Sequence, residues 1–477
     1  MEPITVIGDE YVKRHVEFVS GHNGTTTAEV FWLSALGPIS ILLRNLAIPW
    51  LFPAKNFATG RPSDSVLKLI LDFCFIVLPT VLAYTYLSDS LHYMLLAQGL
   101  LAIALFLFCV CEYVYLYRDK PKFSDVLVER FENRRPYFVT YLRSYTLICT
   151  AIAILAVDFD VFPRRYVKTE TFGYSLMDTG VGVFVTVNAL TAPELRRQRT
   201  RLTKRILMAL PLVVLGFVRL LTVKLSGYHE HVSEYGVHWN FFFTIAAVKI
   251  VSSILFELVP ISCSGLLAVC LGCAYQYALD QLDLKALLLY GVGGGDDRED
   301  LFDANREGLI SVAGYLTLYF AGLQLGALLQ RPRTRLKTWA LLLLQLCVLC
   351  LLSYGLLTVC RVGLGPASRR MANLTYCVWI LFTVLFPMTC FLAVEVLALF
   401  GSAVQLPLYS LGESPFEQLE PCLLCRVNRR ALFYFLMANL MTGMVNFLIK
   451  TIDLDNELST FLLFAYALSL SVIVSVF

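Results

Sequence analysis

Long apolar runs separated by short polar segments form the main pattern along the chain. Because an α-helix rises about 1.5 Å per residue, roughly 20 apolar residues cross the ~30 Å hydrocarbon core of a bilayer. Such runs occur at 30–52, 67–87, 91–117, 138–157, 176–192, 204–223, 238–259, 262–279, 309–330, 337–360, 372–399, 429–449 and 457–477. The pattern predicts an all-α, polytopic integral membrane protein with about 13 transmembrane helices, in a single multi-span membrane domain, 1–477.

Composition agrees with this class and narrows the function. Hydrophobic residues make up 57% of the chain and charged residues 16%, whereas soluble domains are about 25% charged. The net charge of +3 is too small to indicate nucleic-acid binding, and the basic clusters adjoin membrane spans. Most of the 14 cysteines lie inside spans, where they act as small apolar residues, so no disulfide framework is expected. The "CLLC" at 422–425 lacks a second pair or a nearby His, so we predict no metal site there.

The distribution of Lys and Arg predicts the orientation. Residues 1–29 contain no apolar run, so we expect no cleavable signal peptide before the first span. Basic residues are densest at 118–135 and 196–205, in connections on the side opposite the N-terminus. Since cytoplasmic loops are enriched in Lys and Arg, segment 1–29 is predicted to be lumenal, and the linker 400–428 and the C-terminus cytosolic. An odd number of spans agrees with termini on opposite sides.

Chemically versatile residues gather in the connections predicted to face the lumen. Five segments share this property: 21–30, 158–173, 227–240, 301–310 and 368–376. Each alone is typical of a solvated loop with helix caps. Together on one membrane face, they predict a shared polar site.

The segment "DFDVFPRRYVKTETFG" is the most highly charged of the five. Asp158 follows an apolar run directly, and the proline after it turns the chain. Arg164 and Arg165 carry guanidinium groups that match a phosphate or carboxylate, Lys168 carries an ammonium, and Asp158 is a possible base. These groups suit the binding of an anionic headgroup and the removal of a proton from a hydroxyl. A salt-bridged loop anchored at the membrane interface is the alternative.

Ionisable residues also fall in or near the spans. They are Arg44, Asp72, Glu112, Arg143, Asp178, Arg219, Lys249 and Glu395. Each would cost roughly 2.5 to 3.5 kcal/mol at the centre of a membrane helix, so they predict a hydrated cavity or internal ion pairs. Asp178 is the best interior candidate because it precedes "GVG", whose small residues permit close helix approach.

Three histidines lie in 227–240, namely His229, His231 and His238. Their spacing matches no familiar zinc pattern. A lining that orients a sugar or inositol, a general base and a capping role at the interface all remain open for this segment.

Longer motifs carry a resemblance to a known family. They are "DFDVFPRRYVKTETFGYSLMDTGVG", "EHVSEYGVHWNFFFT", "LFDANREGLISVAGY", "SRRMANL" and "NRRALFYFLMANLMTGMVNFLIKT". The chain resembles the glucosaminyl-phosphatidylinositol acyltransferases, the class W family of glycosylphosphatidylinositol-anchor biosynthesis, nearly from end to end. The resemblance implies a multi-pass protein of the endoplasmic reticulum membrane. It also implies transfer of a fatty acyl chain, usually palmitoyl, from acyl-CoA to the inositol 2-hydroxyl of glucosaminyl-phosphatidylinositol.

The resemblance also implies roles for individual residues. Asp158 and Lys168 correspond to the catalytic pair, with Asp158 deprotonating the inositol hydroxyl and Lys168 stabilising the thioester oxyanion. Asp160 leaves open which carboxylate acts. The residues expected to bind the lipid headgroup or the CoA are Asn23, Arg164, Arg165, Glu170, Asp178, His231, Glu234, His238, Asn240, Asn305, Arg306, Glu307, Arg369 and Arg370. We expect no bound cofactor and no metal, with acyl-CoA as co-substrate and membrane lipids as surroundings.

A different class of protein would share some of these features, and the chain also has two possible glycosylation sites. A multi-span secondary transporter with a polar lumenal vestibule would also have interior charges, but no inverted repeat is visible. "NGT" at 23–25 and "NLT" at 373–375 are glycosylation sequons. Both lie so close to a predicted span that a structural or substrate-facing role is preferred for Asn23.

Overall fold

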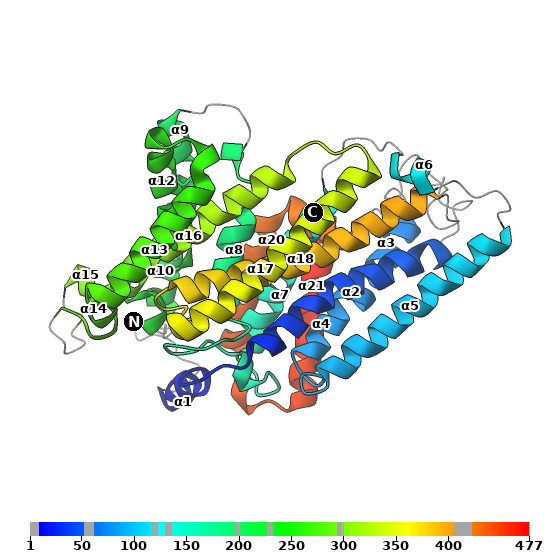
Figure 1. Ribbon diagram of the computed structural model, residues 1–477. Coiled ribbons are helices and arrows are strands. Elements are labelled where there is room, and N and C mark those ends of the chain that lie inside the picture. Colours follow the sequence, from blue (N-terminus) through cyan, green and yellow to red (C-terminus); the bar gives the residue numbers. More distant parts are fainter. Residues whose placement is uncertain are drawn as a thin grey trace. The chain divides into compact units, whose positions relative to one another are not determined.

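The computed structural model describes residues 9–51, 62–116, 123–128, 136–195, 201–226, 232–292, 298, 300–404 and 422–476. These residues are mostly helical and, within them, contain isolated β-bridges but no strands (Figure 1). Twelve helices of this described part are long and apolar enough to cross a membrane. The chain is therefore an all-α multi-pass membrane protein, as its hydropathy pattern predicts.

The run at 176–192 is not a membrane-spanning helix of the predicted length. Helix α8 covers only Thr179–Ala189, 11 residues, or about 16 Å against a ~30 Å hydrocarbon core. Twelve of the thirteen apolar runs thus correspond to such helices in the described residues, in agreement with the prediction of about 13. The hydropathy run counted residues before Asp178 and after Ala189 that lie in turns rather than in the helix. The parity argument for opposite termini depended on this span, so the orientation stays a prediction.

Two compact units make up the chain. The first comprises Met1–Thr27, Arg164–Arg331 and Leu351–Val384, and the second Ala28–Pro163, Pro332–Cys350 and Leu385–Phe477. Helices α17 (Leu336–Gly363) and α18 (Leu374–Ala403) contribute residues to both.

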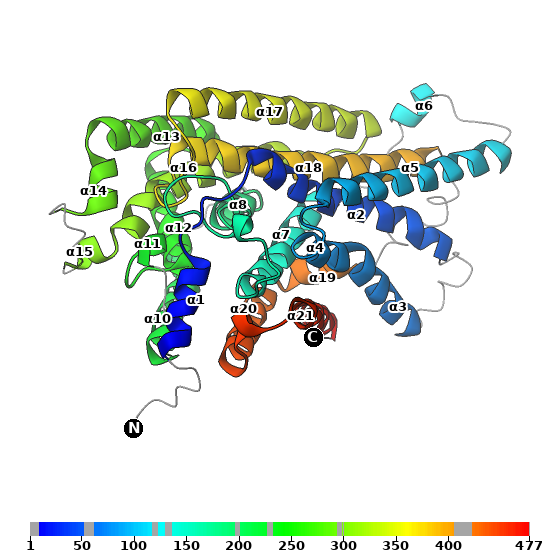
Figure 2. The ribbon, with the colours of Figure 1, turned by 90° about the horizontal axis from the view of Figure 1, so that it is seen from below.

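The first unit is built around α16 (Arg306–Leu329). Its other helices are α1 (Asp9–Val19), α8, α9 (Leu202–Leu207), α10 (Leu210–Ser226), α11 (Val232–Tyr235), α12 (Phe241–Leu258), α13 (Ser264–Gln281), α14 (Leu284–Tyr290) and α15 (Leu301–Ala304). Helix α16 packs against α8, α12 and α13 (Figure 2). A Cβ on Gly322 would lie 2.7 Å from the carbonyl oxygen of Thr186. This glycine is therefore what lets α16 and α8 approach backbone to backbone.

The second unit is built around α7 (Tyr137–Ala156). Its other helices are α2 (Thr27–Leu51), α3 (Pro62–Asp72), α4 (Leu78–Ala83), α5 (Leu91–Leu116), α6 (Phe123–Val128), α19 (Leu423–Arg429), α20 (Ala431–Leu448) and α21 (Asn456–Val476), with a π-helical turn at Phe73–Val77 between α3 and α4. Helices α19, α20 and α21 pack on α7. Of the predicted linker 400–428, residues 405–421 lie outside the described residues, and its ends belong to α18 and α19.

Two charged residues of the second unit that lie in membrane spans form an internal ion pair, one of the two arrangements predicted from the cost of burying charge in a membrane. The Arg44 and Asp72 side chains are 0% and 1% exposed, and Arg44 Nε donates to Asp72 Oδ1 at 2.6 Å. The other carboxylate oxygen accepts the backbone N–H of Leu423 at 2.6 Å. The pair therefore ties α2, α3 and the start of α19 together.

Candidate active site

The N-terminal segment lies along the loop that follows the Asp158 region. Thr25 N donates to the carbonyl oxygen of Tyr174 at 2.6 Å, and Gly21 N donates to Glu170 Oε1 at 2.8 Å. Gly24 has φ +78°, and a Cβ there would lie 2.4 Å from that same Tyr174 oxygen. Only glycine fits this contact, so the "HNGT" motif shapes the loop that carries Lys168.

The segment before α12 is fixed to the start of α16 in the same way. Val237 N donates to the Ala304 carbonyl at 2.7 Å, and His238 N donates to Asn305 Oδ1 at 2.8 Å. Gly236, at φ +103°, lies against the Ala304 carbonyl, where a Cβ would be 2.4 Å from the oxygen. Segments 232–240 and 301–308, predicted to share a site, are therefore direct neighbours.

The loop between α17 and α18 joins these two parts. Gly173 N donates to the Ala367 carbonyl at 2.9 Å, and Tyr376 Oη donates to the Asp178 carbonyl at 2.9 Å. Asn373 holds the loop in shape, since its Oδ1 accepts the N–H of Ser368 and of Tyr376. Arg369 and Arg370 of this loop also contact Glu234 and Glu307, so parts of all five predicted polar segments are brought together in the first unit.

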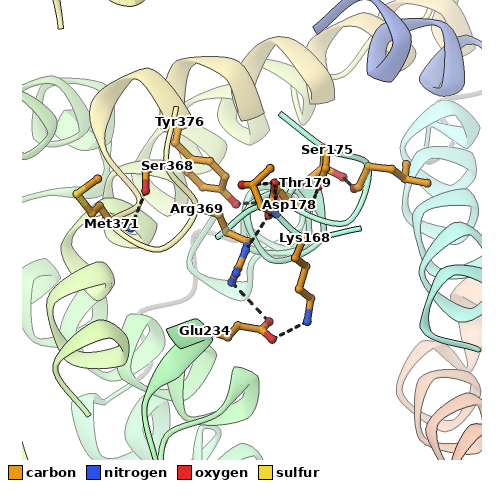
Figure 3. Close-up of polar contacts among 11 residues, drawn as sticks. Lys168, Ser175, Asp178, Thr179, Glu234, Ser368, Arg369, Met371 and Tyr376 are labelled. Atoms are coloured by element: carbon orange, nitrogen blue, oxygen red, sulfur yellow. Dashed lines mark hydrogen bonds and ion pairs between the residues drawn. The ribbon is translucent and has the colours of Figure 1, made fainter. Parts of the chain in front are cut away.

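Four charged side chains of the first unit form a continuous chain (Figure 3). Lys168 Nζ lies 2.5 Å from Glu234 Oε2, Glu234 Oε1 lies 3.5 Å from Arg369 Nη1, and Arg369 Nε lies 2.9 Å from Asp178 Oδ1. Exposure increases along it, from 1% for the Asp178 side chain and 4% for Arg369 to 16% for Glu234 and 36% for Lys168. Two cations and two carboxylates balance, which lowers the cost of burying them. Lys168 is the end of the chain that substrate or solvent can reach.

Asp178 anchors the buried end. It occupies the N-cap position of α8, but its side chain does not cap that helix. Instead it accepts hydrogen bonds from the hydroxyls of Thr169 and Ser175, both at 2.8 Å, as well as the Arg369 bond. Burial raises the pKa of Asp178, and Arg369 with the two hydroxyls opposes that shift.

Close helix approach beside Asp178 is confirmed. A Cβ on Gly182 would lie 2.7 Å from Ile380 Cγ1 and 2.8 Å from Tyr376 Oη, so α8 and α18 meet at this glycine. Of the two glycines in "GVG", Gly182 makes this approach, whereas Gly180 faces open space.

Glu234 is held ionised by its two cations. Burial alone would raise the pKa of Glu234, but the positive charges of Lys168 and Arg369 lower it to about 2. A permanently ionised carboxylate gives Lys168 a fixed partner throughout the physiological pH range. The ammonium of Lys168 therefore has a defined position from which to act.

A second ionic cluster lies at the start of α16. The Glu307 side chain is fully buried, and its Oε1 lies 2.7 Å from Arg298 Nη2 and 2.8 Å from Arg370 Nη2. Within the described residues, Arg370 Nε is buried without a hydrogen-bond partner. Two guanidinium groups thus share the Glu307 carboxylate, and guanidinium groups suit the binding of an anionic group.

Several residues predicted to bind substrate are engaged with the protein backbone. Asn240 caps α12 by accepting the N–H of Phe242, and Asn305 donates to the Leu301 carbonyl. Arg306, fully buried, donates to the Leu288 carbonyl at 3.0 Å.

The remaining predicted residues lie as follows. Arg164 lies over the Phe18 ring at 4.0 Å and Arg165 over the Tyr166 ring at 5.0 Å, whereas Asn23 is exposed. His238 Nδ1 is buried and has no hydrogen-bond partner in the described part of the chain. His231 lies outside the described residues.

Asp158 belongs to the second unit, whereas Lys168 belongs to the first. Its carboxylate is buried at the end of α7 and accepts a hydrogen bond from Asn446 Nδ2 at 2.7 Å. Asp160 is exposed. The two carboxylates therefore differ in environment, and the assignment of the base to Asp158 stays a prediction.

Sequence reasoning missed four polar partners: Thr169, Ser175, Arg298 and Asn446. Two of them left a local signal, since Thr169 follows Lys168 directly and Ser175 precedes Asp178 by three residues, a common spacing for side-chain to backbone contacts. Arg298 lies just before segment 301–310 and Asn446 lies within α20, and neither position left such a signal.

Fold and site together define a multi-pass membrane protein whose first unit carries a buried network of paired charges ending in one accessible lysine. The GWT1 family model matches residues 11–477. The chain is 35% identical over 469 residues to glucosaminyl-phosphatidylinositol-acyltransferase PIGW of Bos taurus, covering 91% of each chain. It is 34% identical over 495 residues to the PIGW protein of Homo sapiens, with 96% of each chain covered.

A fungal protein is similar over the same length. GPI-anchored wall transfer protein 1 of Saccharomyces cerevisiae is 30% identical over 512 residues, covering 98% of this chain and 97% of its own. The chain belongs to the GWT1 family, which confirms the family resemblance of its sequence motifs.

Proposed function

We propose that the protein is an acyl-CoA-dependent O-acyltransferase that modifies the inositol of glucosaminyl-phosphatidylinositol in the endoplasmic reticulum membrane. The observation that carries the proposal is similarity over more than nine-tenths of both chains to proteins named for this acyl transfer. The donor is a fatty acyl-CoA such as palmitoyl-CoA. No bound cofactor or metal is needed for this reaction.

The chemistry uses the two residues that the family resemblance implies as the catalytic pair. The inositol 2-hydroxyl attacks the thioester carbonyl and gives its proton to Asp158, directly or through water. A new C–O ester bond forms, the C–S bond breaks, and CoA leaves as a thiolate that takes up a proton. Lys168 orients the hydroxyl and stabilises the oxyanion that forms on the carbonyl.

The surroundings of the two residues support these roles. Lys168 is the most exposed member of its ionic chain and keeps a fixed carboxylate partner. Asp158 is buried and held by Asn446. The two guanidinium groups that share Glu307 suit the phosphate of the glycolipid or of CoA.

Acyl transfer by the purified protein tests the proposal. Detergent-solubilised protein, incubated with glucosaminyl-phosphatidylinositol and palmitoyl-CoA, should yield acylated glycolipid and one free CoA thiol per product. D158N and K168M should each lower kcat by about 100-fold or more, whereas D160N serves as the matched carboxylate control and should retain turnover. A transporter would consume neither substrate. If D160N lost turnover while D158N kept it, Asp160 rather than Asp158 would be the base.

A further inference from the structure

The loop around Lys168 is attached to one buried carboxylate at two places. Thr169, the next residue, donates its hydroxyl to Asp178 Oδ2 at 2.8 Å and its backbone N–H at 3.2 Å. The tip of Lys168 is connected to the same carboxylate through Glu234 and Arg369 (Figure 3). Asp178 is therefore linked both to the backbone next to Lys168 and, through two side chains, to the Lys168 ammonium.

Arg369 connects the two carboxylates in a way that a smaller cation could not. Its Nε contacts Asp178 and its Nη1 contacts Glu234, so the planar guanidinium fixes the direction of both groups. The two oxygens of Glu234 are divided, one toward Arg369 and one toward Lys168. Turning of the Glu234 carboxylate would break one of these contacts.

The existing partners of Arg369 argue against its direct contact with substrate. Its guanidinium already bridges the carboxylates of Asp178 and Glu234. Arg370, the next residue, is 12% exposed and pairs with the Glu307 carboxylate instead, and its buried Nε has no hydrogen-bond partner among the described residues. Of the two arginines, Arg370 is the less engaged with carboxylates.

We propose that Asp178 and Arg369 are positioning residues for acyl transfer, which act through Glu234 to hold the Lys168 ammonium in its working position. The inference rests on the proposed function. It departs from the expectation that Asp178, Glu234 and Arg369 bind the substrate themselves. Positioning residues affect kcat, whereas residues that bind substrate equally before and during reaction affect KM.

The experiment compares steady-state kinetics of D178N, R369Q and R369K with the wild-type protein. Rates are normalised to the folded, monodisperse fraction in each preparation. Each variant should lower kcat by about 100-fold, as expected when a catalytic group moves by about 1 Å, with KM for the glycolipid within about twofold. R369K keeps the charge but not the two-point contact, so it should not restore the rate. An increase in KM at unchanged kcat would show that Arg369 binds substrate and would overturn the inference.

Double variants separate a shared role from independent effects. D178N and R369Q act on one chain, so their combination should be no slower than R369Q alone, whereas independent effects multiply. The matched control is R370Q on the neighbouring arginine, whose effect should multiply with that of D178N. Equal non-additivity in both pairs would contradict the positioning role.

The pH profile gives a readout that simple destabilisation would not move. Glu234 faces Lys168 and Arg369 directly, with Arg219, Tyr235 and Tyr315 also nearby. In R369Q, one of the two cations that lower the pKa of Glu234 is missing, so this pKa should rise. The acid limb of the kcat profile should therefore move to higher pH. An unmoved acid limb would count against the inference. Absence of transfer by the wild-type protein would instead refute the proposed function.

Discussion

Removing the charge of Asp72 should destabilise the second unit more than any surface substitution. Asp72 and Arg44 are 1% and 0% exposed in two membrane-spanning helices. Loss of one partner leaves the other as an uncompensated buried charge, at a cost of about 3 to 5 kcal/mol. This corresponds to a decrease of roughly 100- to 4,000-fold in the folding equilibrium constant.

The backbone contact of Asp72 makes the size of the effect depend on the substitution. D72N keeps an oxygen that can accept the N–H of Leu423, which now lies 2.6 Å from Oδ2. D72A removes that acceptor and should cost about 1 to 3 kcal/mol more, the penalty of an unsatisfied buried donor. The difference between D72A and D72N therefore measures the tie to α19 separately from the ion pair.

A double-mutant cycle measures the ion pair itself. Unfolding of wild type, R44M, D72N and R44M/D72N is followed by circular dichroism during titration with SDS in mixed micelles. The double variant should be much more stable than the sum of the two single losses predicts, because it leaves no unpaired charge. Additive losses, or a D72N cost below about 1 kcal/mol, would refute the reasoning from burial.

Three other predictions follow from single sites. G314A should lower stability by about 1 to 3 kcal/mol, because its Cβ would lie 2.0 Å from the carbonyl oxygen of Ala372. The control G355A faces open space and should not create such a clash. The same SDS titration compares the two variants. Asn373 should carry no glycan despite its sequon, because its amide is buried and hydrogen-bonded, so endoglycosidase treatment should leave the mass of a peptide containing it unchanged. The pKa of Glu234 is lowered from 4.5 to about 2, so its ionised carboxylate should stabilise the fold fully above pH 4.5. This contribution should disappear as the pH falls toward 2. Acid unfolding of E234Q should lack this pH-dependent loss of stability.

Hydropathy predicts the helices of this protein well because membrane spans are decided locally. Each described span corresponds to one apolar run, since about 20 residues in one helix must meet the bilayer without help from distant segments. The exception is 176–192, where contacts from a distant segment matter. Apolar residues there lie in turns beside Asp178, where tertiary contacts satisfy the backbone and no continuous helix is required.

The membership of the candidate site was also partly predictable, but its pairings were not. Charges in an apolar chain must be compensated, so Asp72 and Asp178 could be identified as residues with partners. The partners themselves lie 28 residues away for Asp72 and 191 residues away for Asp178. No periodicity relates such positions. Only the folded chain shows that Glu234 faces Lys168 rather than open solvent.

The two adjacent arginines show why pairing decides function. From sequence, Arg369 and Arg370 are equivalent candidates for an anionic ligand. In the fold, Arg369 bridges two carboxylates, whereas Arg370 shares one carboxylate with Arg298 and has a buried donor without a partner in the part of the chain that the structure describes. A guanidinium whose charge is already balanced gains little from a phosphate, but one that shares its carboxylate gains much. The same dipeptide therefore supplies one residue suited to positioning Lys168 and one suited to binding an anion.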